Sequence, residues 1–277
     1  MDKLRRSESW ALVVLASFTL ASLIGFATFG RHPELLAAFP KLAGLYAPAF
    51  TFFARGHIVL ALGALAVILW NRAGLKWLPA FGLVCVLSLG AELLGTATGF
   101  PFGSYHYTEL LGWRIADRVP ALIPASWFVM ALPSYGLARA VVANSWGRWL
   151  YGAALLATWD LSLDPAMSSL TPYWGWDVAG SFYGMPAVNL LGWLATGVLL
   201  MVGLDLTGAH RVTDEVPRRL LGAYYGVVLS LSVGMVIVGG YWWAVLATAG
   251  ALAVLALVPN LVLAVTRPVS DLAAEGG

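Results

Sequence analysis

The stretch WALVVLASFTLASLIGFATF, from Trp10 to Phe29, is about 20 residues long and carries no charged side chain. A helix needs about 20 apolar residues to cross a bilayer core about 30 Å thick. The basic start that precedes it, Lys3-Leu4-Arg5-Arg6, gives it the look of a signal peptide. A signal core, however, has only about 7–15 apolar residues. We therefore expect this stretch to remain in the chain as the first transmembrane span.

Further apolar segments follow along the whole chain, and together they predict an all-α, polytopic transmembrane bundle of about eight spans. Of the 277 residues, 60% are hydrophobic and 11% are charged, whereas a soluble domain carries about 25% charged residues. Such a chain cannot cover a water-facing surface, so we expect a single integral membrane domain over residues 1–277. The spans are placed at 10–29, 49–70, 77–95, 121–142, 148–163, 186–206, 219–238 and 241–265.

Charge and cysteine content exclude some classes of function. A net charge of +2 is too small to indicate binding to nucleic acid. The chain has one cysteine, Cys85, so a disulfide within the chain and a cysteine-rich metal site are both excluded. Because no His-x-x-x-His or comparable ligand set occurs, we expect no metal site.

The distribution of positive charge predicts the orientation of the spans, since cytoplasmic loops are enriched in Lys and Arg. With the N-terminus inside, eleven of the 16 Lys and Arg residues lie inside and five lie outside. Both termini are therefore predicted to be cytoplasmic, in a bacterial or archaeal cell membrane. A seven-span alternative, with the C-terminus outside, arises if the first span or the break at Gly239-Gly240 is misassigned.

Two long connections, 96–120 and 164–185, are predicted to be non-cytoplasmic. Both are rich in Gly, Pro and aromatic residues rather than in Ser, Glu or Lys. Segments of this composition are expected to fold against the bundle.

Three acidic residues fall near the outer ends of predicted spans. Acidic groups in a membrane cost about 2.5–3.5 kcal/mol on insertion scales and mark functional sites. Asp160 and Asp164 are four residues apart and so share one helix face, and Glu92 lies at the same depth. Two close carboxyls cannot easily hold two charges, so a proton donor and a carboxylate are expected together. The structural alternatives are that Glu92 pairs with Arg55 and that Asp164 ends its helix before a proline.

Other polar and aromatic residues are predicted at the same depth. Arg55 and His57 start the second span, where His57 is either a proton shuttle or a hydrogen-bonded core histidine. Trp and Tyr are normally enriched at membrane interfaces, but a lining of aromatic rings also suits a long apolar ligand or a cation. The candidate substrate-binding residues are Tyr105, Trp127, Trp159, Trp174, Trp176, Tyr183, Asn189 and Trp193.

Three signatures resemble the CruF-type carotenoid 1,2-hydratase family of membrane proteins. The first runs from Glu92 to Tyr107, ELLGTATGFPFGSYHY, and the second from Trp159 to Met167, WDLSLDPAM. The third combines YWGWD at 173–177 with GSFYGMPAVN at 180–189 and LLGW at 190–193. The likeness covers about residues 50–240.

The resemblance implies water addition to the terminal double bond of an acyclic carotenoid end group, such as that of lycopene, γ-carotene or a bacterioruberin-type precursor. It implies no cofactor. The expected partners are the lipid-soluble carotenoid, membrane lipid and other carotenoid-pathway enzymes.

The chemistry of alkene hydration assigns roles to these residues. Protonation at C2 gives a tertiary cation at C1, which water then attacks, so the site needs positioned acid and base groups and electrostatic stabilisation of charge. One member of the pair Asp160 and Asp164 is predicted to be the acid, and the other member, or Glu92, to activate water. Asn189 and Tyr105 are expected to position that water, and Trp127, Trp159, Trp174 and Trp176 to line the pocket.

Three rival functions use some of the same features. A membrane prenyltransferase would use Asp160-x-x-x-Asp164 to hold a magnesium diphosphate, but the remaining membrane acid, Asp205, falls at the inner end of its span. A carotenoid cyclase would use the same protonation without water capture. A proton-coupled transporter would need polar groups through the midplane and often paired repeats, and no repeat is evident here.

Overall fold

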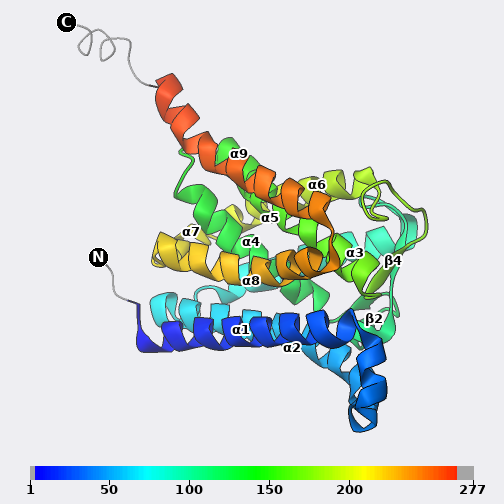
Figure 1. Ribbon diagram of the computed structural model, residues 1–277. Coiled ribbons are helices and arrows are strands. Elements are labelled where there is room, and N and C mark those ends of the chain that lie inside the picture. Colours follow the sequence, from blue (N-terminus) through cyan, green and yellow to red (C-terminus); the bar gives the residue numbers. More distant parts are fainter. Residues whose placement is uncertain (1–3, 267–277) are drawn as a thin grey trace, which may run out of the picture.

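The fold is an all-α bundle, seen in a computed structural model that describes residues 4–266, except for the side chains at 42, 43, 47 and 258–266. The long helices are α1 (Arg6–Gly25), α2 (Pro40–Ala73), α3 (Leu78–Thr98), α4 (Ile123–Arg139), α5 (Ser145–Asp164), α6 (Ala187–Leu206), α8 (Arg218–Gly239) and α9 (Trp242–Thr266) (Figure 1). A one-turn helix, α7 (His210–Thr213), follows α6. The predicted fold class is confirmed.

Each of the eight predicted spans coincides with one long helix. Among the described residues, five stretches are long and apolar enough to cross a bilayer: Arg6–Gly30, Gly44–Ala73, Leu78–Thr98, Ala187–Leu206 and Arg218–Val238. α4 has only 17 residues, and α5 carries Asp160 and Asp164. The chain is thus a membrane protein, and its number of full crossings stays a prediction.

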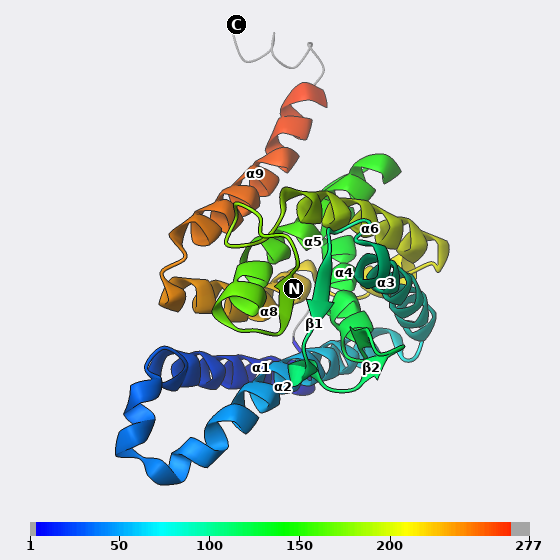
Figure 2. The ribbon, with the colours of Figure 1, turned by 90° about the vertical axis from the view of Figure 1, so that its right-hand side faces the viewer.

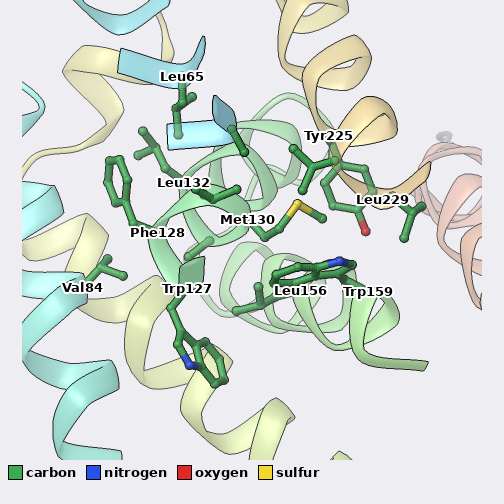
Figure 3. Close-up of a cluster of buried hydrophobic side chains, with 14 of the residues drawn as sticks. Leu65, Val84, Trp127, Phe128, Met130, Leu132, Leu156, Trp159, Tyr225 and Leu229 are labelled. Carbon is green, nitrogen blue, oxygen red and sulfur yellow. The ribbon is translucent and has the colours of Figure 1, made fainter. Parts of the chain in front are cut away.

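Helix α4 forms the centre of the bundle. Every residue from Trp127 to Gly136 is buried, because α2, α3, α5, α6 and α8 all pack against this helix. Figure 3 shows the resulting core, in which Phe128, Met130 and Leu132 of α4 meet Leu65, Leu156 and Leu229 from neighbouring helices. Neighbouring helices therefore shield most of α4 from its surroundings.

The ends of α3 and α5 differ from the predicted loop boundaries. α3 continues to Thr98 and ends at Gly99, whose left-handed φ of +81° lets its N–H bond the Gly95 carbonyl. α5 continues to Asp164 and passes into a π-helical segment, η4 (Pro165–Leu170). Because Pro165 has no N–H to donate, the wider π turn occurs where the α-helical ladder is interrupted.

The two predicted loops are joined by a short antiparallel ribbon, and both fold against the bundle as expected. Strand β1 (Tyr105–Tyr107) pairs with β4 (Trp174–Trp176), with Tyr105 opposite Trp176 and Tyr107 opposite Trp174 (Figure 2). A second small pair, β2 (Arg114–Ile115) and β3 (Val119–Pro120), closes the first loop. A 3₁₀ turn, η3 (Glu109–Leu111), lies between β1 and β2.

The connection from α1 to α2 projects from the bundle as an arch. It consists of a π-helical segment, η1 (Phe26–Gly30), a 3₁₀ helix, η2 (Pro33–Ala38), and the first turns of α2 (Figures 1 and 2). In Figure 1 the arch and the ribbon lie at the right-hand end of the bundle, whereas α1 starts and α9 ends at the left. Both ends of the described chain therefore lie on one side, as an even number of crossings requires.

Candidate active site

A cavity of about 100 Å³ lies beside the ribbon, at the end of the bundle where the predicted acids meet. Glu92 from α3 and Asp160 and Asp164 from α5 all line it, and all three are buried. Eight of the other predicted site residues line the same space: His57, Tyr105, Trp127, Trp159, Trp174, Trp176, Asn189 and Trp193. Residues far apart in sequence therefore form one cavity, which we call the acid cavity.

Glu92 accepts hydrogen bonds at both carboxyl oxygens. Tyr105 and Tyr107 donate their hydroxyls to Oε2, the latter at 2.9 Å, and Trp127 donates its indole N–H to Oε1 at 2.8 Å. Burial, with the Glu92 carboxylate beside them, raises the pKa of both Tyr105 and Tyr107, so these phenols stay protonated and act as donors. Because these partners surround Glu92, the alternative in which it pairs with Arg55 is wrong.

Asp164 also accepts several hydrogen bonds. Oδ1 accepts from the Ser168 hydroxyl at 2.7 Å and from the Trp176 indole at 3.0 Å. Oδ2 accepts from the Trp174 indole at 3.2 Å. A carboxylate in the charged form is an acceptor only, so this set of donors stabilises the charged form of Asp164 against the cost of its burial. The alternative in which Asp164 simply ends its helix does not account for the two indoles.

The ribbon supplies four of these donors because side chains alternate along a strand. Tyr105 and Tyr107 point to one face of β1, and Trp174 and Trp176 lie directly across from them on β4. The paired rings are in contact, with centroids 5.4 Å apart for Tyr105 and Trp176 and 6.0 Å apart for Tyr107 and Trp174. The same face of the ribbon thus donates hydrogen bonds to Glu92 from its tyrosines and to Asp164 from its tryptophans.

Asp160 has a different environment from the other two acids. Its Oδ2 accepts from the Asn189 amide at 2.6 Å, whereas Oδ1 is buried with no hydrogen-bond partner among the described residues. No hydrogen bond joins Asp160 to Asp164, so the predicted pair does not share a proton directly. A buried carboxyl with one free oxygen favours the neutral form, since an unpaired buried charge is very costly.

Three tryptophan rings form part of the remaining wall, beside aliphatic residues such as Ile58 and Leu163. The Trp127 and Trp193 rings stack with centroids 4.2 Å apart, and Trp159 meets Trp193 edge to face at 6.0 Å. Gly192 lets the segment of Pro101 and Phe102 pack closely against α6, because a Cβ there would lie 2.6 Å from the Phe102 ring and 2.7 Å from the Pro101 carbonyl oxygen. The wall therefore combines apolar volume with ring faces that attract cations.

His57 of α2 faces the acid cavity with one free ring nitrogen. Its Nδ1 lies 3.3 Å from the Thr19 hydroxyl, which itself donates to the Leu15 carbonyl at 2.9 Å. With that hydroxyl proton already in use, we assign Nδ1–H as the donor to Thr19. In this neutral tautomer Nε2 carries the lone pair. Nε2 is buried and no described residue meets the full geometry of a hydrogen bond to it, although the Val228 backbone carbonyl lies beside the ring.

Two predicted site residues do not line the acid cavity. Arg55 donates to the carbonyls of Leu110, at 3.0 Å, and Glu109, at 3.4 Å, and so anchors the turn between β1 and β2. Tyr183 stacks on Tyr241 with centroids 4.1 Å apart, and its hydroxyl accepts from the Trp243 N–H. Both support connecting segments rather than the cavity wall.

The sequence prediction omitted Tyr107, Ser168 and Tyr173 from the site. Tyr107 and Tyr173 line the acid cavity, and Ser168 donates to Asp164. The spacing of Tyr105 and Tyr107 was a usable signal, because residues two apart on a strand share a face. The positions of Ser168 and Tyr173 depend on the π-helical segment, which no pattern in the sequence predicted.

Asp205 is the acid at the opposite end of the bundle, as predicted. It accepts from the Tyr135 hydroxyl and from the Trp149 indole, and so ties α6 to α4 and α5. It does not line the acid cavity. Among the described residues, no group of three or more His, Cys, Asp or Glu side chains has the arrangement to hold a metal ion.

Comparison with known proteins gives two matches. Residues 53–256 match the family described as carotenoid biosynthesis protein. Bisanhydrobacterioruberin hydratase of Haloarcula japonica is 32% identical over 215 residues, which cover 73% of this chain and 70% of that protein. No solved structure matches the chain significantly. The matched region contains all three cavity acids and the ribbon.

The hydrogen bonds to Glu92 predict a stability effect. Glu92→Gln replaces one acceptor oxygen by an amide donor, so at least one of Tyr105, Tyr107 and Trp127 loses its partner. We expect a loss of about 1–3 kcal/mol, the cost of one buried unpaired donor, measured as a lower thermal unfolding midpoint in detergent. Glu109→Gln is the control, because Glu109 is exposed and bonds only Arg114 across the surface. Equal midpoints for the two variants would contradict the prediction.

Proposed function

The chain belongs to the carotenoid biosynthesis protein family, and from this premise we propose that it is a carotenoid hydratase acting on an acyclic end group. The proposal agrees with the CruF-type signatures and with the name of the Haloarcula relative. The observation that carries it is the unpartnered Oδ1 of Asp160, a buried carboxyl oxygen in an aromatic cavity. This atom is where a proton donor for an alkene would have to be.

Asp160 is the proposed general acid. A trisubstituted alkene is a weak base, so its protonation needs an acid held against it without competing hydrogen bonds. Of the three cavity acids, Asp160 has the fewest donors around it: Asn189 holds one oxygen and leaves the other free. Asn189 is therefore the residue that orients the acid, rather than the water-positioning residue that the sequence suggested.

Glu92 and Asp164 are the proposed electrostatic partners of the cation. Each accepts three side-chain hydrogen bonds, which stabilise the charged carboxylate. Fixed negative charge stabilises a cation that develops in a low-dielectric site. The ring faces of Trp127, Trp159 and Trp193 add cation–π attraction.

His57 Nε2, the second cavity atom without a hydrogen-bond partner among the described residues, is the proposed acceptor for the attacking water. Asp160 transfers its proton to C2 of the terminal double bond, and the π electrons form the new C–H bond and leave a tertiary cation at C1. The water oxygen bonds C1, and its proton passes to Nε2. Return of that proton to the Asp160 carboxylate restores both groups, so the net change is the addition of one water.

The proposed substrates are carotenoids with an acyclic isopropylidene end, such as lycopene, γ-carotene or a bacterioruberin-type precursor. The relative is named for bisanhydrobacterioruberin, which favours the last class. We also propose that the ribbon end of the bundle faces away from the cytoplasm. The charge bias supports this orientation, and it would place the cavity near the interfacial water that hydration consumes.

Expression in a lycopene-producing host tests the reaction itself. We expect the pigments to gain the mass of one or two water molecules, because water captures the cation at one or both ends. Mass spectrometry of the extracted carotenoids gives the result. An isomer of unchanged mass would identify a cyclase instead, and activity that depends on magnesium would favour a prenyltransferase. Proton flux in carotenoid-free liposomes would favour a transporter.

Asp160→Asn tests the proposed acid. We expect turnover per folded protein to fall by about 10²–10⁴-fold, the contribution typical of a positioned acid, while the amide still occupies the carboxyl volume. The control is Asp205→Asn, which alters a hydrogen-bonded carboxyl that does not line the acid cavity and should leave turnover unchanged. Product formation is measured by liquid chromatography on equal amounts of purified protein. Full activity in Asp160→Asn would end the assignment.

His57→Phe tests the proposed water acceptor. The phenyl ring keeps the volume of the imidazole but has no lone pair, so water loses its acceptor and turnover should fall by about 10²-fold or more. Carotenoid bound to the purified protein, measured by its visible absorbance, should not change. Wild-type turnover in this variant would show that His57 is a core residue only.

A further inference from the structure

A second cavity of about 500 Å³ lies under the arch. Its walls come from α1, η1, η2, the first turns of α2, η4 and α8, and they include Phe26, Phe50 and Phe53. It is several times larger than the acid cavity. We call it the arch cavity.

The two cavities are neighbours that share part of their walls. Ala54, Met167, Tyr173 and Leu231 line both. A ligand long enough to leave the acid cavity past these residues would therefore enter the arch cavity.

The arch cavity offers apolar surface and almost no free polar group. No charged residue lines it. The hydroxyls of Ser22, Thr28 and Thr171 donate to carbonyls of their own helical segments at 2.7–2.8 Å, and the Tyr173 hydroxyl donates to the Phe50 carbonyl at 2.9 Å. With these groups already satisfied, the lining suits an extended hydrocarbon.

The arch cavity also reaches the surface of the bundle. Ile24 is 56% exposed and Leu45 is 63% exposed, yet both line the cavity. Exposed apolar side chains at this position face the lipid around a membrane protein. A hydrocarbon can therefore pass between the bilayer and the cavity without crossing water.

We propose that the arch cavity binds the polyene chain of the carotenoid and admits it from the lipid, while the end group occupies the acid cavity. The inference rests on the proposed function for the identity of the occupant. An acid cavity of about 100 Å³ is far too small for a whole carotenoid, so the rest of the substrate needs apolar space directly beside the end group. The arch cavity provides that space.

Retention of carotenoid by purified protein tests the proposal. Asp160→Asn serves as the background, because it blocks protonation and leaves the substrate intact. In a lycopene-producing host, we expect Asp160→Asn protein to purify with bound lycopene, measured as visible absorbance per mole of protein. Adding Ala49→Phe, which fills the arch cavity from α2, should lower the bound lycopene by about tenfold or more.

Two further variants make the result specific. Gly25→Leu fills the cavity from the opposite wall, and a Cβ at Gly25 meets no atom within 4 Å, so the helix accepts the side chain. It should also lower retention. Ala16→Phe is the matched control, since Ala16 is an exposed residue of α1 that lines neither cavity, and it should retain lycopene fully.

The outcomes separate binding from chemistry. Three substitutions of increasing volume, Ala49→Val, Ala49→Leu and Ala49→Phe, are compared. The smallest of them, Ala49→Val, is the change expected to leave the fold intact. Each variant is measured as a monodisperse fraction. Retention that falls with side-chain volume supports the proposal. Equal retention in all three variants, or no lycopene on Asp160→Asn protein, overturns it. If wild-type protein adds no water to lycopene while the retention pattern holds, the proposed reaction fails and the binding site stands.

Discussion

The alternation of side chains along a two-stranded ribbon is the constraint on which the site depends. β1 and β4 each present two aromatic residues to the same face, and these four side chains hold Glu92 on α3 and Asp164 on α5. A shift of the pairing by one residue would turn every one of them to the opposite face. The residues on that other face, His106 and Gly175, could not replace them. The register of three residue pairs thus fixes the electrostatics of a membrane-embedded cavity.

This arrangement makes three buried acids chemically different. Burial alone would act on Glu92, Asp160 and Asp164 alike, since each is almost fully enclosed. What separates them is the number of donors: three side-chain donors around Glu92, three around Asp164, and one around Asp160. Donors stabilise a carboxylate, and their absence favours the protonated acid. Under the proposed function, one cavity would then hold a proton donor beside two anions, which is the combination that a cationic intermediate requires.

The sequence predicted the acids better than it predicted their partners. Helix periodicity and the order of spans were enough to bring Glu92, Asp160 and Asn189 to one depth, because both are local properties. The pairing of Tyr105 with Trp176 is not local, since it joins segments on either side of α4 and α5. Without that pairing, Arg55 and Tyr183 looked equivalent to residues that line the cavity. The π-helical segment after Asp164 could not be predicted from the sequence either, because a proline that follows a helix usually indicates its end.

The two cavities are formed largely by different parts of the sequence. The matched family region covers residues 53–256, so it includes all three acids of the acid cavity and both strands of the ribbon. Most of the arch, from η1 through η2 to the first turns of α2, precedes residue 53. Under the proposed function, the chemistry of the end group then belongs to the family region, whereas contact with the polyene belongs largely to a segment before it. A hydratase organised in this way can accept chains of different length without moving its acid, because the two tasks meet only at the few residues that both cavities share.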